Sequence, residues 1–331
     1  MEQNIIISAT GMYVPDNKVY NEYFVEHFNR LGLKSEGLMT HLGRRKRYLA
    51  TEKDNSLTMA YEACKNALSK IDMEAMALDL VVFVSDTPEY NMPTNALKLV
   101  NMLEAGQARM VFDMNSNCTG MLTGMDIVAG YMKNKPDLRK ALVVGSFHIS
   151  SVARDTDTVV YPNFADAAAA VILEKREEER TRGLLDSEVF TDASYESNVT
   201  LPKCGYSKIR SAEVEPEQKR LEWNPFDFSF LSDQWTSLIR TLLMRHGLTP
   251  EQIDYYVFSQ LSDPDNMATL KKLGVSEEKY FFLGKEYGYT GNTCPILVLN
   301  RMWDVIAARG NKVVFCSVGA GYSIIALLYE F

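Results

Sequence analysis

The sequence predicts an α/β protein built from two copies of one unit, each copy with its own sheet. Two observations support this prediction: three strand types recur in the same order in both halves, and a helical stretch precedes the first strand of each set. Chance could produce one such match, but three in the same order favour duplication. Strands buried on both faces read as continuous apolar runs, and helices are expected to cover those faces.

The first recurring strand spans Leu78 to Asp86 in the first half and Ile253 to Asp263 in the second. Each follows a stretch with apolar residues at helical spacing, Leu57 to Ile71 and Trp235 to Arg245 respectively. We therefore expect a helix and then a buried strand at equivalent places in the two halves.

The second and third strands recur in the same way. The second spans Lys140 to Ser146 and then Lys312 to Ser317. The third is rich in small and apolar residues and ends in an acid, from Asp166 to Glu174 and from Gly321 to Glu330. These matches place the first half at residues 1–175 and the second at 176–331.

Residues 176–230 are expected to connect the halves and to cover a pocket. The stretch opens with a charged run that is most simply a solvated turn, and it holds the aromatic residues Trp223, Phe226, Phe228 and Phe230. These rings could form the wall of a binding tunnel, although aromatic residues that pack a loop over a core are the commoner case.

Cys118 is the residue most suggestive of chemistry. A strand-like stretch from Ala108 to Met114 leads to it through small polar residues, and an amphipathic stretch from Met121 to Met132 follows. A thiol at a helix N-terminus is expected to have a lowered pKa, and thiolate is the nucleophilic form. The alternative is a small apolar residue that packs the first turn of a core helix.

Composition narrows the class of protein. With a net charge of -8, nucleic acid is an improbable partner, and the 46% hydrophobic fraction suits a large core. The five cysteines lack metal-like spacing and are odd in number, so we expect neither a metal site nor a disulfide framework. The chain shows no signal-peptide pattern and no apolar run of membrane-spanning length, so we expect no membrane contact and a cytoplasmic location.

Taken together, the Cys118 motif and four further landmarks resemble the β-ketoacyl-acyl carrier protein synthase III family of the thiolase superfamily. These landmarks are Ile7 to Pro15, Leu42 to Ala50, Asp166 in its Phe-Ala-Asp-Ala-Ala context, and Gly319 to Tyr322. The resemblance covers essentially the whole chain. It implies a thiolase-like duplicated αβαβα layered fold, with two five-stranded sheets around buried helices.

The resemblance also implies a mechanism. Cys118 would accept the acyl group, and Gly321 would lend a backbone N–H, with that of Cys118, to an oxyanion hole. The substrates would be acyl-coenzyme A or the phosphopantetheine of an acyl carrier protein, with no cofactor. Members dimerise, so a homodimer is expected, or else a heterodimer with a homologue that keeps the full set of catalytic residues.

Two catalytic positions depart from the family pattern. The family's histidine lies in a His-Gln-Ala-Asn sequence, and the aligned stretch here begins with Ser259. The family's asparagine comes from a Gly-Asn-Thr-Ser turn, and the alignment with residues 288–291 puts Tyr289 there. Asn292, three residues on, could be recruited if the turn is shifted. His148 is expected to be structural.

These departures affect one half-reaction more than the other. Decarboxylative condensation with a malonyl thioester needs donors that hold an enolate, whereas a hydroxyl and a phenol are poor bases near neutral pH. Acyl transfer to Cys118 needs only an activated thiol and an oxyanion hole. We therefore expect an acyltransferase of fatty-acid or secondary-metabolite synthesis with weakened condensation. The alternatives are acyl transfer to an oxygen or nitrogen acceptor, and a catalytically degenerate subunit of a heterodimeric synthase.

Three further residues are candidates for substrate binding. By the resemblance, Met92 would cap the acyl pocket of the partner subunit, although a plain core methionine is as plausible. Arg44 and Arg45 belong to the densest positive run of an acidic chain. They could meet the phosphates of coenzyme A or the acidic face of an acyl carrier protein, or they could form a solvated face.

Overall fold

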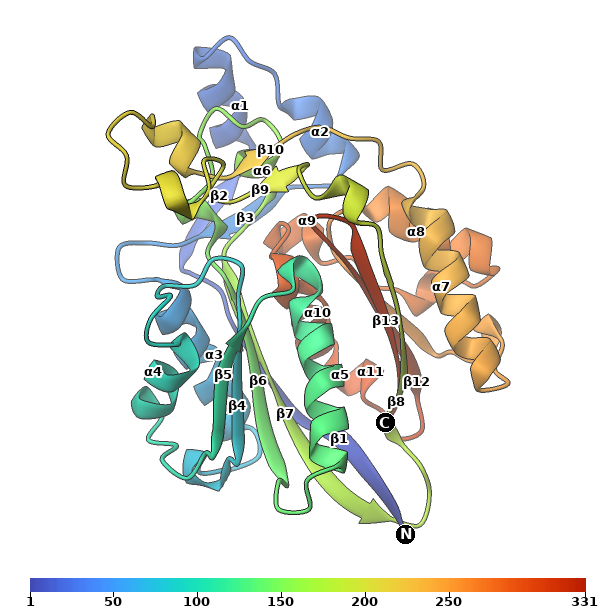
Figure 1. Cartoon of the computed structure of the whole chain (residues 1–331). Helices are drawn as coiled ribbons and strands as arrows, with labels where there is room; N and C mark the ends of the chain where they lie inside the picture. Colours follow the sequence, from blue (N-terminus) through green and yellow to red (C-terminus); the bar gives the residue numbers. More distant parts are fainter.

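The computed structural model describes all 331 residues and shows five layers (Figure 1). Two sheets enclose a central pair of helices, and each sheet carries another helix pair on its outer face. The central pair is α5 (Gly120–Lys133) and α10 (Cys294–Arg301); the outer pairs are α3 (Ser56–Ser69) with α4 (Asn95–Met102), and α7 (Leu231–Arg245) with α8 (Asp263–Leu273). This is the predicted duplicated, thiolase-like α/β fold.

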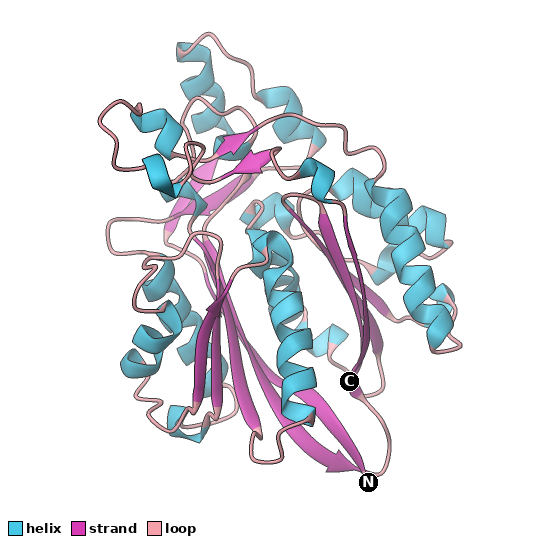
Figure 2. Cartoon of the chain, in the orientation of Figure 1, coloured by secondary structure: helices cyan, strands magenta, loops and turns pink.

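The first sheet has five strands in the order β1-β7-β6-β4-β5. β4 is parallel to β5 and β6, whereas β7 is antiparallel to β6 and β1. Their bounds are β1 Glu2–Tyr13, β4 Leu80–Val84, β5 Met110–Met114, β6 Lys140–Phe147 and β7 Ala167–Glu178. Figure 2 shows the strands of this sheet side by side.

The second sheet has four strands, so the prediction of five was wrong for this half. The order β11-β12-β13-β8 repeats the pairing of the first sheet: β11 is parallel to β12, and β13 is antiparallel to β12 and β8. The bounds are β8 Gly183–Thr191, β11 Tyr255–Phe258, β12 Lys312–Gly319 and β13 Ser323–Glu330. The fifth strand shrinks to one bridge between Tyr256 and Tyr280, because the chain turns into α9 (Gly284–Tyr287) soon afterwards.

The remaining elements lie mainly over one end of the sheets, above the N-terminus of α5 (Figure 1). They are β2 (Asn17–Tyr20), α1 (Asn21–Arg30), α2 (Glu36–His41), β3 (Lys46–Leu49), α6 (Val160–Asn163), β9 (Val199–Thr200) and β10 (Glu222–Trp223), while α11 (Trp303–Ile306) follows α10. The chain changes sheets between Glu178 and Gly183, close to the predicted boundary at residue 175. None of the helices is both long and apolar enough to cross a membrane.

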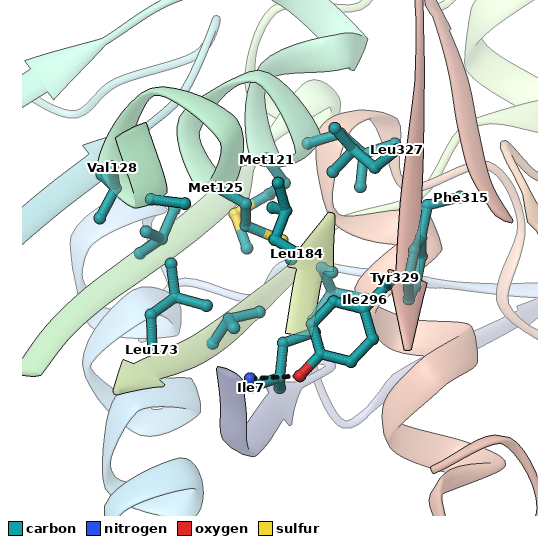
Figure 3. Close-up of a cluster of buried hydrophobic side chains, with 14 of the residues drawn as sticks. Ile7, Met121, Met125, Val128, Leu173, Leu184, Ile296, Phe315, Leu327 and Tyr329 are labelled. Carbon is teal, nitrogen blue, oxygen red and sulfur yellow. Dashed lines mark hydrogen bonds between the residues drawn. The ribbon is translucent and has the colours of Figure 1, made fainter. Parts of the chain in front are cut away.

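The two central helices are buried because apolar side chains of both sheets pack against them. Met121, Met125 and Val128 of α5 pack in one cluster with Ile296 of α10 (Figure 3). A helix that is apolar on most sides is stable only in a core. This packing fixes where α5 begins, and it therefore fixes the position of Cys118.

Tyr329 supports the junction between the sheets with a buried hydrogen bond. Its hydroxyl accepts from the backbone N–H of Ile7 at 2.6 Å (Figure 3), where the register of β1 against β7 shifts. Tyr329→Phe leaves that N–H unpaired and is expected to lower the free energy of unfolding by about 1–3 kcal/mol. The check is denaturant unfolding of Tyr329→Phe in parallel with Tyr206→Phe, which removes a hydroxyl from an exposed ring. Equal stability of both variants would contradict the assignment.

Candidate active site

The duplication places Cys118 and Asn292 at equivalent positions. A short 3-10 turn precedes each central helix: η2 (Asn117–Thr119) before α5 and η9 (Gly291–Thr293) before α10. The first residue of each turn has a positive φ, 49° at Asn117 and 56° at Gly291. Cys118 and Asn292 are the middle residues of the two turns, so both side chains lie at the ends of the buried helices.

Cys118 lines a cavity of about 360 Å³. Of the 21 residues around it, 14 are hydrophobic, and none is Lys, Arg or His. Trp223, Phe226 and Phe228 of the connecting segment form part of the wall, so the tunnel interpretation of these rings fits better than simple loop packing. Phe230 instead packs on Tyr322, with ring centroids 4.7 Å apart. A volume and lining of this kind suit an acyl chain.

The environment of the Cys118 thiol opposes ionisation, contrary to the expectation of a lowered pKa. Burial raises the pKa of Cys118 most, and the negative charge of Asp86 raises it further. The hydroxyl of Tyr289 and the backbone N–H of Ala320 act in the other direction by hydrogen bonding. Burial outweighs these hydrogen bonds, so the resting thiol is neutral.

Tyr289 lies directly beside the nucleophile. It is 2% exposed, and its hydroxyl is within hydrogen-bonding reach of both Cys118 and Ser259. Burial raises its pKa well above the ordinary value, so it is a neutral donor. Its backbone is fixed by a bond from Tyr289 N to Asn163 O at 3.0 Å, and its ring packs edge-on to Phe164 with centroids 4.9 Å apart.

Ser259 is brought close to this group but does not reach the cavity. It is fully buried at the end of β11, and its hydroxyl lies 3.8 Å from the Cys294 sulfur. The phenol of Tyr289 lies between Ser259 and Cys118. The large residue at 289 and the small one at 259 are therefore complementary in volume, and the phenol fills the space that a longer side chain at 259 would need.

Asn292 is fully buried, and both atoms of its side-chain amide lack a hydrogen-bond partner. The glycine at position 145 in β6 leaves room for the Asn292 side chain, because a Cβ there would lie 2.5 Å from Asn292 Oδ1. The residues Gly291-Asn292-Thr293-Cys294 also match the family's Gly-Asn-Thr-Ser turn in type. The structure therefore favours the shifted register, in which Asn292 rather than Tyr289 takes the asparagine position.

The loop after β12 completes the site. Gly319, Ala320 and Gly321 line the cavity, and Gly321 has a φ of 73°. Gly319 packs so closely on η2 that a Cβ there would lie 3.4 Å from Cys118 N. The backbone N–H of Ala320 is directed to the Cys118 thiol, and the role of Gly321 in an oxyanion hole remains a prediction.

Arg44 is buried and is not part of an exposed phosphate-binding patch, so that prediction was wrong for this residue. Arg44 is 4% exposed and donates from Nη2 to the carbonyls of Gln260 and Leu261, at 3.0 and 2.6 Å. Burial lowers its pKa to about 10. Arg44 thus holds the loop that follows Ser259. Arg45 is exposed and pairs with Glu286 at 3.3 Å, and its role in substrate binding remains a prediction.

Met92 lies outside the cavity of its own chain. It is 87% exposed in the segment that precedes α4, so it is not the core methionine of the alternative interpretation. Its role as a cap on the partner's pocket remains a prediction.

The site also contains a residue that the sequence reasoning missed. Asp86 lines the cavity with Cys118, and burial raises its pKa to about 6. The available signal was its place after the apolar strand Leu80–Val84, because polar groups at the carboxyl ends of parallel strands commonly form sites. No group of three or more His, Cys, Asp or Glu residues is arranged to hold a metal ion.

Comparisons with known proteins agree with this geometry. The model described as 3-oxoacyl-[acyl-carrier-protein (ACP)] synthase III matches residues 112–193, and the model of its C-terminal part matches residues 243–331. These segments contain Cys118, Ser259, Asn292 and Gly321. A β-ketoacyl-[acyl-carrier-protein] synthase III from Chlorobium phaeovibrioides is 27% identical over 326 residues, which cover 97% of each chain.

Solved structures show the same fold. The 3-oxoacyl-[acyl-carrier-protein] synthase III from Aquifex aeolicus superposes with a TM-score of 0.86 at 22% identity, over the whole of both chains. The priming β-ketosynthase of the R1128 polyketide biosynthetic pathway gives a TM-score of 0.88 at 20% identity, over 99% of this chain and 96% of that one. The chain belongs to the β-ketoacyl-acyl carrier protein synthase III family, the acyl-transferring condensing enzymes with the thiolase-like fold.

Proposed function

We propose that this chain forms an acyl thioester on Cys118, with acyl-coenzyme A or an acyl carrier protein as donor. The observation that carries the proposal is the position of Cys118, which faces an apolar cavity of about 360 Å³ from the turn before a buried helix. The Cys118 sulfur attacks the thioester carbonyl, the bond to the donor's sulfur breaks, and the donor leaves as a thiol with the proton.

Backbone N–H groups near Cys118 are proposed to stabilise the charge that develops on the carbonyl oxygen. The loop Gly319–Gly321 packs against η2, so its amides and that of Cys118 are close together. Donors that are already oriented stabilise an oxyanion strongly, because no reorganisation is needed during the reaction. Ala320, whose N–H faces the thiol, and Gly321 are the two candidates on this loop.

The second half-reaction is proposed to be slow. No imidazole lines the cavity, and the group that faces Cys118 is the neutral phenol of Tyr289. The phenol donates a hydrogen bond but does not readily accept a proton, since its pKa is raised by burial. Asn292 supplies at most one of the two donors that hold an enolate. These features fit an enzyme that primes fatty-acid or secondary-metabolite synthesis in the cytoplasm. It would act as a homodimer in which Met92 of each subunit caps the acyl pocket of the other.

Intact-mass spectrometry tests the proposal. The purified chain is incubated with a panel of acyl-coenzyme A thioesters and with acyl carrier proteins that bear the same acyl groups. We expect one acyl mass per chain with at least one donor, removed by neutral hydroxylamine as a thioester is. If no donor of either kind leaves an adduct, the chain is not an acyl-accepting enzyme, and the degenerate-subunit alternative gains support.

A further inference from the structure

Asp86 is a carboxylate without a counterion next to the nucleophile. It lines the same cavity as Cys118, and its Oδ1 is buried with no hydrogen-bond partner. The cavity holds no Lys, Arg or His that could pair with it. Because a buried polar group without a partner costs free energy, an unpaired carboxylate at this place needs an explanation beyond packing.

The residues on either side of Asp86 hold it in this orientation. Ser85 donates from Oγ to the carbonyl of Ser146 at 2.8 Å and accepts from the N–H of Thr87 at 3.0 Å. Thr87 Oγ1 accepts from the N–H of His148 at 2.8 Å. Ser85 and Thr87 are thus held by hydrogen bonds to the core of the first half, whereas Asp86 Oδ1 in the cavity wall has no partner.

We infer that the Asp86 carboxylate is the proton acceptor for Cys118, in the place of the histidine that this chain lacks. This inference rests on the proposed function. As the Cys118 sulfur attacks the donor's carbonyl, its proton passes to Asp86. When the bond to the donor's sulfur breaks, Asp86 returns the proton to the leaving thiolate, so the carboxylate is regenerated. Tyr289 and the Ala320 N–H stabilise the sulfur by hydrogen bonding while the proton is away.

The electrostatics of the cavity fit this role. The other titratable groups that line it are Cys118, Tyr289 and Glu196. Burial raises the pKa of the thiol and of the phenol, so both stay protonated near neutral pH. Glu196 is exposed at the rim. Asp86, with its pKa raised to about 6, is ionised near neutral pH and is a stronger base than an ordinary carboxylate.

The test is the rate of Cys118 acylation against pH for the wild type and for Asp86→Asn. A proton acceptor works only when it is ionised, so the wild-type rate is expected to rise with pH around a midpoint near 6. Asp86→Asn is expected to lower the rate about a hundredfold and to remove this rise. Asp86→Glu is expected to recover part of the rate and to keep the rise.

Glu196→Gln is the matched control, since it removes the other carboxylate of the cavity, and it is expected to keep the pH dependence. Folding is checked by thermal unfolding. The pKa of Asp86 is raised from 3.8 to about 6 in the folded state, so the folded state loses stability as the pH rises through this range. Asp86→Asn removes this loss, and it should therefore raise Tm at pH 7.5 but not at pH 4.

An Asp86→Asn variant that acylates at the wild-type rate with the same pH dependence would overturn the inference. A change in KM alone would also overturn it and would assign Asp86 to recognition of the acyl group. If the wild type itself is not acylated at any pH, the proposed function fails instead.

Discussion

Cys118→Ala is expected to abolish formation of the acyl adduct, with a fall in rate of at least about a thousandfold. None of the three buried thiols can take its place. Cys294 is the nearest candidate, but it does not line the cavity, and burial raises its pKa to about 11. Cys64 and Cys316 are fully buried in the clusters between each sheet and its outer helices. The check is the intact mass after incubation with the best donor.

Two variants make this experiment specific. Cys204 belongs to the connecting segment and is partly exposed, so Cys204→Ala is expected to keep the adduct while it removes the most accessible competing thiol. Cys294→Ala is expected to keep the adduct as well. An acyl group that persists in Cys118→Ala, or that maps to a peptide with Cys204 or Cys294, would show that another residue is the nucleophile.

A histidine at position 259 is expected to raise the rate of malonyl decarboxylation about a hundredfold, but only when Tyr289 is replaced by a smaller residue at the same time. One oriented donor is worth about 3 kcal/mol in stabilising such a charge. Ser259 is separated from Cys118 by the phenol, so Ser259→His alone overfills the site and should chiefly destabilise the fold, by about 1–3 kcal/mol. Ser259→His with Tyr289→Ala provides both the donor and the room.

The measurement is carbon dioxide release from malonyl thioesters by the wild type, both single variants and the double variant. The two positions share one space, so the gain in the double variant should exceed the product of the two single effects. Tyr289→Phe serves as the control for the hydroxyl, because it keeps the ring and removes only the donor. A double variant no faster than the wild type would contradict the account of this pocket.

Much of the fold could be predicted from the sequence because buried strands and helices leave periodic apolar patterns. β4, β6 and β7 and their counterparts β11, β12 and β13 lie where the repeat placed them. The fifth strand of the second sheet could not be excluded, since its loss is a matter of length: the chain makes one bridge at Tyr280 and then turns. Such a difference between duplicated halves is set by tertiary packing, and no local pattern reports it.

The candidate site was predictable only where a residue's role depends on its local context. Cys118 sits in a turn before a helix, and the sequence around it shows this. The positions of Ser259 and Tyr289 depend on how two distant loops meet, and the register at Asn292 depends on where η9 begins. The arginines show the same limit: Arg44 looks like a surface charge in the sequence, yet the carbonyls of Gln260 and Leu261 hold it in the interior.

We propose that this chain retains acyl transfer to Cys118 while the decarboxylation step is impaired. The most direct test compares two rates on one preparation of the wild type: single-turnover acylation by its best donor and carbon dioxide release from a malonyl thioester. We expect acylation to be at least about a hundredfold faster, because Ser259 stands at the family's histidine position and a neutral phenol faces the thiol. Decarboxylation as fast as acylation would contradict the account.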